Sequence, residues 1–457
     1  MNIVICGAGR VGFTIAKLLS EQNHSITVID QSSDDIQKIN ETLDVKAIVG
    51  KATSPAILEK ANISEANMII AVTRNDEINI LICQIAYSLF KTPKKIARIR
   101  SKEYLDPKFS QLFNKENLPI DFVISPEIEI AKSIHRKLES PGASDNVPFA
   151  DNNIRLLEIL VDERCPIFNI KLNELTKKFP KLNANILGVV RENKFIFLKK
   201  NDVMKKNDKV YVVINALQIQ DTLEAFGHND PISKKILLIG GGNIGYNLAK
   251  YIETSSNDTR LKIIEKNKER AEYLASELSN TIIINGDGLD EEVLREANLE
   301  ETETVIALTN DDEDNLMVGV LVEKFSSNKR TMVLTTKPNY SLLQSSLKID
   351  DLIDPRMNTV SSILKHVHKG TIESAYSILN GEYEVIEAEI IETSDLVNKE
   401  LKNADLPDEI KIGAVLRGKE VIIPRSSYVF KKNDIIVFLS KKDQIPLVEN
   451  IFRISAV

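Results

Sequence analysis

Short apolar runs recur along the first part of the chain, and amphipathic segments separate them. The runs span residues 3–6, 26–30, 47–50, 68–73, 96–100 and 122–124. Continuous apolar runs are typical of parallel strands buried on both faces, whereas strands with one solvated face alternate apolar and polar residues. Between the first two runs, Ile15, Leu18 and Leu19 stand at helical spacing. The pattern therefore predicts an α/β domain with a doubly wound parallel sheet.

The same series of apolar runs returns in the second half of the chain. These runs span residues 236–239, 261–265, 282–286, 305–309, 331–335 and 352–353. A glycine-rich segment follows the first run of each series, and the two segments begin 233 residues apart. This offset is far longer than the period of a solenoid repeat. It indicates that a whole pair of domains has been duplicated.

A small β-rich module follows each predicted sheet. Its strands are expected at 154–160, 188–190, 195–197 and 210–214, and again at 385–391, 413–415, 421–423 and 435–439. We therefore predict two Rossmann-like domains with doubly wound parallel sheets, each followed by a small α+β domain. The expected boundaries are 1–138, 150–228, 233–370 and 380–457. Residues 139–153 contain Pro141, Gly142 and Pro148, so we interpret them as a linker and a candidate hinge.

Each glycine-rich segment has the spacing of a dinucleotide-binding loop between a strand and a helix. In such a loop the first glycine permits the turn, the second lets a pyrophosphate approach, and the third allows close helix packing. The helix N-terminus then attracts the phosphates. The two loops are Gly7-Ala8-Gly9-Arg10-Val11-Gly12 and Gly240-Gly241-Gly242-Asn243-Ile244-Gly245.

An acidic residue ends the next strand in both copies. Asp30 lies 18 residues after the last glycine of its loop, and Glu265 lies 20 residues after its own. This spacing is typical of the carboxylate that binds an adenosine ribose. The sequence therefore predicts two nucleotide sites. The alternative for each is a vestigial loop whose glycines serve packing only.

The two predicted sites differ in charge. Arg10 in the first loop corresponds to Asn243 in the second, and Lys51 after the third strand corresponds to Asp287. An arginine beside a phosphate can form charge-assisted bonds, although Arg10 can equally be a solvated residue at a helix start. We therefore expect the first site to be more cationic and to favour a more phosphorylated ligand.

Composition narrows the functional classes. The chain has 457 residues and a net charge of −7, and nucleic-acid binders usually carry a basic patch, so we expect no nucleic-acid partner. Three scattered cysteines indicate a reducing compartment. No apolar run approaches the ~20 residues that span a bilayer, so we expect any membrane contact to be made through a partner. His366 and His368 do not share a helical face, and we expect no metal site.

The small modules contain no histidine, and no other acid/base set for catalysis stands out. We therefore expect a protein that is not an enzyme. The alternative is an NAD-dependent oxidoreductase with a divergent catalytic domain.

The arrangement resembles the RCK (regulator of potassium conductance) domains, and in doubled form the peripheral regulatory subunit of bacterial Trk potassium uptake systems. The resemblance rests on the first glycine loop, Asp30, Thr73, residues 75–79, Ala97-Arg98, Glu103-Tyr104 and 140–143. It implies that the first site comprises Gly7 to Val11, Asp30, Thr73, Arg74 and Arg98, and the second Gly240 to Ile244 and Glu265. Lys51 departs from the family's usual aspartate.

The resemblance also implies ligands and partners. The expected ligand is NAD, as NAD+ or NADH, with ATP and ADP as further candidates. The expected assembly is a homo-oligomer, a tetramer, in which the small modules assist assembly. It would lie at the cytoplasmic face of the cell membrane and gate a Trk-type membrane subunit that transports potassium.

Overall fold

The computed structural model describes most of the chain, in two compact units. The described residues are 1–21, 24–163, 165–179, 182–255, 258–325, 329–344, 346–355, 363, 372–407, 409–445, 447 and 451. One unit is built on Met1–Ile130, and the other on Ala131–Ile353 with the C-terminal part of the chain. The last residues of the predicted domain 233–370 lie outside the described residues, as do His366 and His368.

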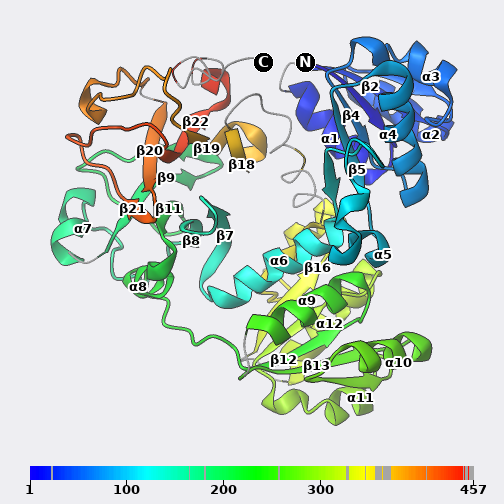
Figure 1. Ribbon diagram of the computed structural model, residues 1–457. Helices are drawn as coiled ribbons and strands as arrows, with labels where there is room; N and C mark the ends of the chain where they lie inside the picture. The colour runs from blue at the N-terminus through cyan, green and yellow to red at the C-terminus, as the bar shows by residue number, and fades with distance from the viewer. Residues whose placement is uncertain are drawn as a thin grey trace. The chain divides into compact units, whose positions relative to one another are not determined.

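The first unit holds a six-stranded parallel sheet in the order β3-β2-β1-β4-β5-β6 (Figure 1). The order reverses between β1 and β4, so this is the point where open α/β sheets bind ligands beyond the carboxyl ends of their strands. The strands are β1 (Asn2–Cys6), β2 (Ser25–Asp30), β3 (Lys46–Val49), β4 (Met68–Ala71), β5 (Lys94–Arg98) and β6 (Phe122–Ile124). The helices are α1 (Arg10–Glu21), α2 (Ser33–Thr42), α3 (Pro55–Lys60), α4 (Asp76–Phe90) and α5 (Lys102–Leu105). Helix α6 (Pro126–Glu139) begins in this unit and continues into the second.

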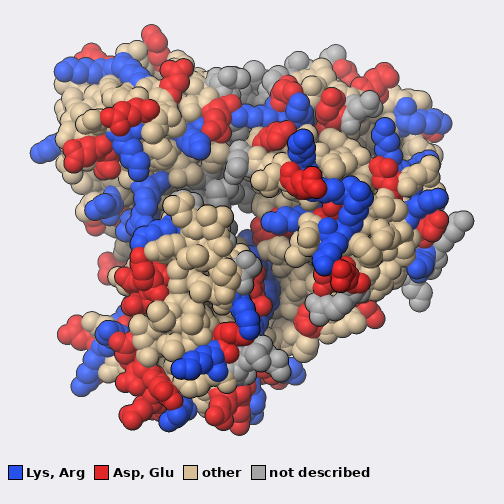
Figure 2. Space-filling view, turned by 180° about the vertical axis from the view of Figure 1, so that it is seen from behind, with Lys and Arg blue, Asp and Glu red and all other residues tan. Residues whose placement is uncertain are grey.

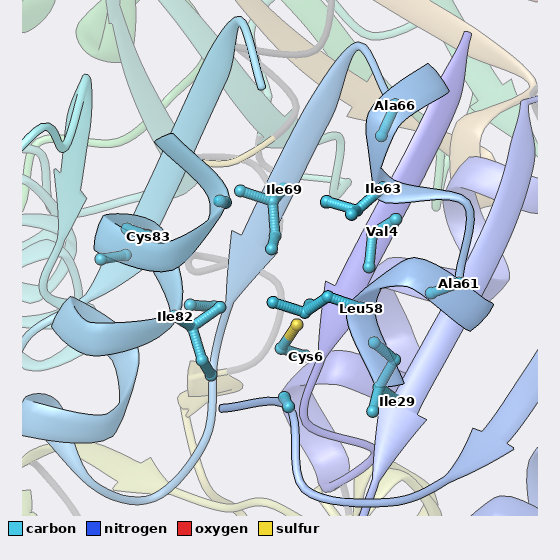
Figure 3. Close-up of a cluster of buried hydrophobic side chains, with 14 of the residues drawn as sticks. Val4, Cys6, Ile29, Leu58, Ala61, Ile63, Ala66, Ile69, Ile82 and Cys83 are labelled. Carbon is cyan, nitrogen blue, oxygen red and sulfur yellow. The ribbon is translucent and has the colours of Figure 1, made fainter. Parts of the chain in front are cut away.

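One face of this sheet packs against α3 and α4. Figure 3 shows Cys6 and Ile69 of the strands beside Leu58 of α3 and Ile82 of α4, all fully buried. Burial raises the pKa of the Cys83 thiol on α4 to about 12 and raises the pKa of Cys6 still further. Both thiols therefore stay protonated at neutral pH and act as small core residues.

The second unit contains a six-stranded parallel sheet with the same topology, β14-β13-β12-β15-β16-β17. Its strands are β12 (Lys235–Ile239), β13 (Arg260–Glu265), β14 (Thr281–Asn285), β15 (Thr304–Ala307), β16 (Arg330–Leu334) and β17 (Asp351–Ile353). Its helices include α9 (Asn243–Ser255), α10 (Lys268–Glu277), α11 (Glu291–Glu296) and α12 (Asp312–Phe325). The predicted duplication of a doubly wound sheet is confirmed.

The second unit also holds two five-stranded antiparallel sheets, in the orders β10-β9-β11-β8-β7 and β18-β19-β22-β20-β21. The first comprises β7 (Ala143–Phe149), β8 (Ile154–Leu160), β9 (Ala184–Arg191), β10 (Lys194–Ile196) and β11 (Lys209–Asn215), with α7 (Leu172–Lys178) and α8 (Ile219–Ala225). The second comprises β18 (Ile372–Ile378), β19 (Tyr383–Glu389), β20 (Ile410–Arg417), β21 (Glu420–Ile422) and β22 (Ile435–Lys441).

The two antiparallel sheets share a hydrophobic core and a near-symmetric contact. Leu187 and Val213 of the first belong to one buried cluster with Ala414 and Val437 of the second. Two polar side chains at equivalent positions then cross between the sheets. Asn185 Nδ2 donates to Ile412 O at 2.9 Å, and Lys411 Nζ donates to Ile186 O at 2.7 Å.

The predicted linker at 139–153 is wrong, because Glu139 ends α6 and residues 143–149 form strand β7. This strand pairs antiparallel with β8. Arg136 Nε of α6 donates to Asn146 O at 3.0 Å, and buried Asn146 donates back to Ser140 Oγ at 3.2 Å. Gly142 and Pro148 are helix breakers, but they do not make this segment a linker. Gly142 lies in a tight turn with φ +99°, and Pro148 lies on an edge strand, where a missing N–H is tolerated.

Within the described part of the chain, every helix is too short or too polar to cross a membrane.

Candidate nucleotide-binding sites

The first glycine loop joins β1 to α1 at the carboxyl edge of the sheet. Gly7 has φ +116°, a conformation that L-residues rarely adopt. A Cβ on Gly12 would lie 1.8 Å from Gly7 O, so α1 can approach the loop only if this residue is glycine. A Cβ on Gly9 would meet nothing within 4 Å. The loop is therefore tight at its first and third glycines and open at its second, where a pyrophosphate would lie.

Asp30 at the end of β2 holds this loop in place. Its Oδ2 accepts a hydrogen bond from Ala8 N at 2.6 Å, and its Oδ1 accepts one from Ser32 N at 2.9 Å. Ser32 in turn caps α2, because its hydroxyl accepts from Asp35 N. A carboxylate has about four acceptor positions, so Asp30 keeps capacity for a ribose hydroxyl while bracing the loop.

A cavity of about 740 Å³ opens beside the first loop. This volume is in the usual range for small-molecule sites. Among the predicted residues, Gly7, Gly9, Asp30, Thr73 and Arg74 line the cavity. Further lining residues that sequence reasoning did not assign to the site include Gln31, Ser32, Asp35, Asn75 and Ile78.

The other predicted residues of the first site do not line this cavity. Ala8 and Gly12 are buried in the loop, and Arg10 and Val11 begin α1. Arg98 instead faces Glu127 at the start of α6, with 3.5 Å between Arg98 Nη2 and Glu127 Oε1.

A buried asparagine connects the cavity to Arg98. Asn79 Oδ1 accepts from both Thr73 N and Thr73 Oγ1, at 2.9 and 2.7 Å. Asn79 Nδ2 donates to Arg98 O at 2.8 Å. Asn315 makes the same bonds to Thr309 and Leu334 O in the second copy. Asn79 and Asn315 therefore occupy equivalent positions in the two copies, and both link the ends of two neighbouring strands.

The second glycine loop repeats this geometry. Gly240 has φ +104°, a Cβ on Gly245 would lie 2.2 Å from Gly240 O, and a Cβ on Gly242 would meet nothing within 4 Å. Glu265 Oε2 accepts from Gly241 N at 2.7 Å. Asn243 and Ile244 begin α9, as Arg10 and Val11 begin α1.

The expectation that the first site is the more cationic does not hold near the acidic residue that ends the second strand of each parallel sheet. Arg270, on the first turn of α10, donates from Nε to Gly241 O at 2.8 Å. Its guanidinium lies 5.0 Å from the centre of the Tyr273 ring. The corresponding position in the first copy is Asp35, which lines the cavity. The sequences of the two loops do not reveal Arg270, because this residue belongs to α10 and contacts the loop only in the folded structure.

A second difference is an exposed ion pair at the second site. Lys266 Nζ lies 2.7 Å from Asp287 Oδ2. This hydrogen bond raises the pKa of Lys266 and lowers the pKa of Asp287. The corresponding residues of the first copy, Gln31 and Lys51, cannot form an ion pair, and both line the cavity.

Comparison with protein families finds the same duplicated plan. The TrkA-N domain matches residues 3–126 and 236–355, and the TrkA-C domain matches 156–227 and 385–453. The chain is 39% identical over 455 residues to the "Trk system potassium uptake protein TrkA" of Azorhizobium caulinodans, covering 100% of this chain and 99% of that protein. It is 34% identical over 460 residues to the protein of the same name from Haemophilus influenzae, again covering 100% and 99%.

Solved structures with the same fold include RCK domains. The GsuK RCK domain superposes with a TM-score of 0.61 at 16% identity, covering 99% of this chain and 95% of that one. A structure described as "GsuK channel bound to NAD" gives a TM-score of 0.61 at 17% identity, covering 99% and 79%. The RCK fold expected from the sequence is thereby confirmed.

Proposed function

Because the chain belongs to the TrkA family, we propose that it is the peripheral regulatory subunit of a Trk-type potassium uptake system. It would lie at the cytoplasmic face of the cell membrane and gate a membrane subunit that transports potassium. The observation that carries this proposal is the full-length match to Trk system potassium uptake proteins, together with two glycine loops of nearly identical geometry. Its output would be a change of shape, since a ligand shifts a conformational equilibrium by its differential affinity for the two states.

The ligand we propose is a nucleotide: NAD+ or NADH, with ATP and ADP as further candidates. The open space over Gly9 and Gly242, each just before a helix, supports phosphate binding at both loops. We propose that Asp30 and Glu265, which each accept a hydrogen bond from the loop backbone, also bind the ribose. GsuK, which has the same fold, has been solved with NAD and with ADP.

We propose that the chain is not an enzyme. The lining of the first cavity contains no histidine, tyrosine or cysteine, and its Asp30 already accepts two backbone hydrogen bonds. The alternative, an NAD-dependent oxidoreductase, predicts that purified protein oxidises NADH in the presence of a simple acceptor. We expect NADH to bind and to remain reduced.

We further propose that the chain forms a homo-oligomer, a tetramer, and binds no nucleic acid. Leu89 near the end of α4 is 61% exposed, and Phe325 at the corresponding place on α12 is 38% exposed. Leu81 of α4 and Met317 of α12 are also exposed at matching positions, so each helix carries more than one exposed apolar side chain, and apolar surface of this kind supports self-association. Figure 2 shows Lys and Arg interspersed with Asp and Glu over the face in view, rather than gathered into a basic stripe. Light scattering on a Leu89→Glu, Phe325→Glu variant would test the assembly.

The decisive experiment is reconstitution. A Trk-type membrane subunit is placed in vesicles with and without this protein, and potassium flux is measured with NADH, NAD+, ATP, ADP or no nucleotide. We expect flux to depend on both the protein and the nucleotide. Flux that is independent of both would refute the proposal, whatever binding is measured.

A further inference from the structure

Three cationic side chains share one face of the second parallel sheet, at the amino ends of β12 and β13. Lys235 of β12 pairs in register with Arg260 of β13. Lys262 follows two residues after Arg260, and alternate residues of a strand point to the same face. All three line a cavity of about 620 Å³. This cavity lies at the opposite edge of the sheet from the second glycine loop, because that loop follows the carboxyl end of β12.

The cavity carries a positive charge in an acidic chain. Glu301 is the single acidic residue of its lining, so the lining has a net charge of +2, whereas the whole chain has −7. Lys235 Nζ lies 3.0 Å from Glu301 Oε2, and this contact lowers the pKa of Glu301. Lys262 Nζ donates to Ala297 O at 2.8 Å, at the end of α11. The guanidinium of Arg260 is exposed and makes no hydrogen bond or ion pair among the described residues.

The first copy shows that the fold does not require these cations. The sheet registers place Asn2, Ser25 and Thr27 where the second copy has Lys235, Arg260 and Lys262. Lys46 of β3 stands in place of Ile282 of β14, and its Nζ donates to Lys60 O at the end of α3 at 2.7 Å. In the second copy Lys262 makes the equivalent bond from the neighbouring strand. Ile282 is therefore left 58% exposed beside the cations.

The lining indicates the chemistry of a ligand. Its volume is in the range of small-molecule sites. The planar fork of an arginine binds two oxygens of a phosphate at once. A phosphate monoester carries a charge of about −1.5 to −2 at neutral pH, which matches the +2 of the lining. A carboxylate would neutralise only half of that charge. Ile282 offers an apolar surface to the organic part of the ligand.

We propose that this cavity binds a small phosphate monoester. Arg260 holds two of the phosphate oxygens, and Lys235 and Lys262 supply the remaining charge while they keep their bonds to Glu301 and Ala297 O. The organic group lies against Ile282. The second parallel-sheet domain then has a ligand site at its amino edge that is separate from the glycine loop and independent of the proposed nucleotide binding.

The test titrates the full chain carrying Gly9→Val and Gly242→Val, which fill the open space over both glycine loops. Inorganic phosphate and phenyl phosphate are the probes in calorimetry. Arg260→Gln loses the charge-assisted bonds and should weaken both probes about 10- to 100-fold. Ile282→Ser should weaken phenyl phosphate more than inorganic phosphate, because only phenyl phosphate has an apolar group. Glu301→Gln should tighten both probes, since it removes the negative charge of the lining.

Lys348→Gln is the matched control. It removes an exposed cation of the same sheet domain that lies outside the cavity lining, so both affinities should stay unchanged. A second readout is pH. Because a phosphate monoester gains its second charge near pH ~6, phenyl phosphate should bind more weakly at about pH 5 than at about pH 7.5. Sulfate is dianionic at both pH values and the lining contains no histidine, so sulfate should bind equally at both.

The outcomes decide the proposal. If phosphate binds Arg260→Gln as tightly as Lys348→Gln, the cavity attracts an adventitious ion only and the site is refuted. Failure of phenyl phosphate to bind at all refutes it too. If Arg260→Gln does not fold, Arg260→Lys carries the test, because it keeps the charge but not the planar fork and should still weaken both probes. None of these results bears on the glycine loops, so nucleotide sensing is judged separately.

Discussion

At the scale of single residues, the carbonyl oxygen of Gly7 limits how much side chain the first loop tolerates. A Cβ at position 12 would lie 1.8 Å from it, whereas position 9 faces open space. We expect Gly12→Ala to destabilise the protein by about 1–3 kcal/mol, as overpacking does. Gly9→Ala should unfold at nearly the wild-type denaturant concentration. Equal midpoints for the two variants would show that the loop can relax away from the contact.

Position 9 should instead control binding. Gly9→Val places two methyl groups where the pyrophosphate is expected, and it meets no protein atom within 4 Å of its Cβ. We expect a folded protein whose first site no longer binds NADH. Titration against Gly242→Val, the same change in the second loop, would assign each binding event to its loop. A double variant that still binds like the wild type would place the nucleotide elsewhere.

At the scale of elements, strand β7 is an element that the pattern of apolar residues does not predict. Residues 143–149 include the polar stretch 144–146 and Pro148, so their sequence does not predict a strand; they form one by pairing with the edge of β8. The strands of the two parallel sheets are predictable, since their continuous apolar runs arise from burial on both faces. The position of Arg270 cannot be predicted from the sequence pattern. This residue lies on α10, 29 residues after Gly241 in the chain, and it reaches Gly241 O only in the folded structure.

The reassignment of β7 predicts its exchange behaviour. Its backbone pairs with β8, and buried Asn146 ties it to Ser140, so its amides should exchange far more slowly than those of a linker. Deuterium uptake in peptides covering 143–149 should be slower than in a linker but faster than in β8, because β7 pairs on one side only and β8 on both. Residues 229–233, which precede β12 without forming a helix or strand, provide the reference for fast exchange. Equally fast uptake in both segments would restore the hinge interpretation.

At the scale of the whole molecule, the paired antiparallel sheets contain a partly buried cation, Lys411. Desolvation lowers the pKa of Lys411 from 10.5 to about 8. The folded state therefore releases this proton at lower pH than the unfolded state, so stability should rise as pH increases from about 8 towards 10.5. Below that window both states are protonated and the cost of burying the charge is constant.

The measurement is the free energy of unfolding against pH for the wild type, Lys411→Met and the exposed control Lys419→Met. The advantage of Lys411→Met over the wild type should shrink as pH rises through this window. Lys419→Met should follow the wild-type curve. A constant difference between Lys411→Met and wild type would mean that Lys411 titrates normally.

The two antiparallel sheets belong to one chain, and this explains how Lys411 can lie where they meet. If two identical chains met in this way, equivalent residues would make equivalent contacts, so a second Lys411 would take the place of Asn185 and two ammonium groups would need acceptors at this contact. Here the opposite position holds the neutral Asn185, and each side chain donates to the other strand. Because both sheets belong to one chain, the two equivalent positions can hold different residues, and the contact between the sheets is not symmetric.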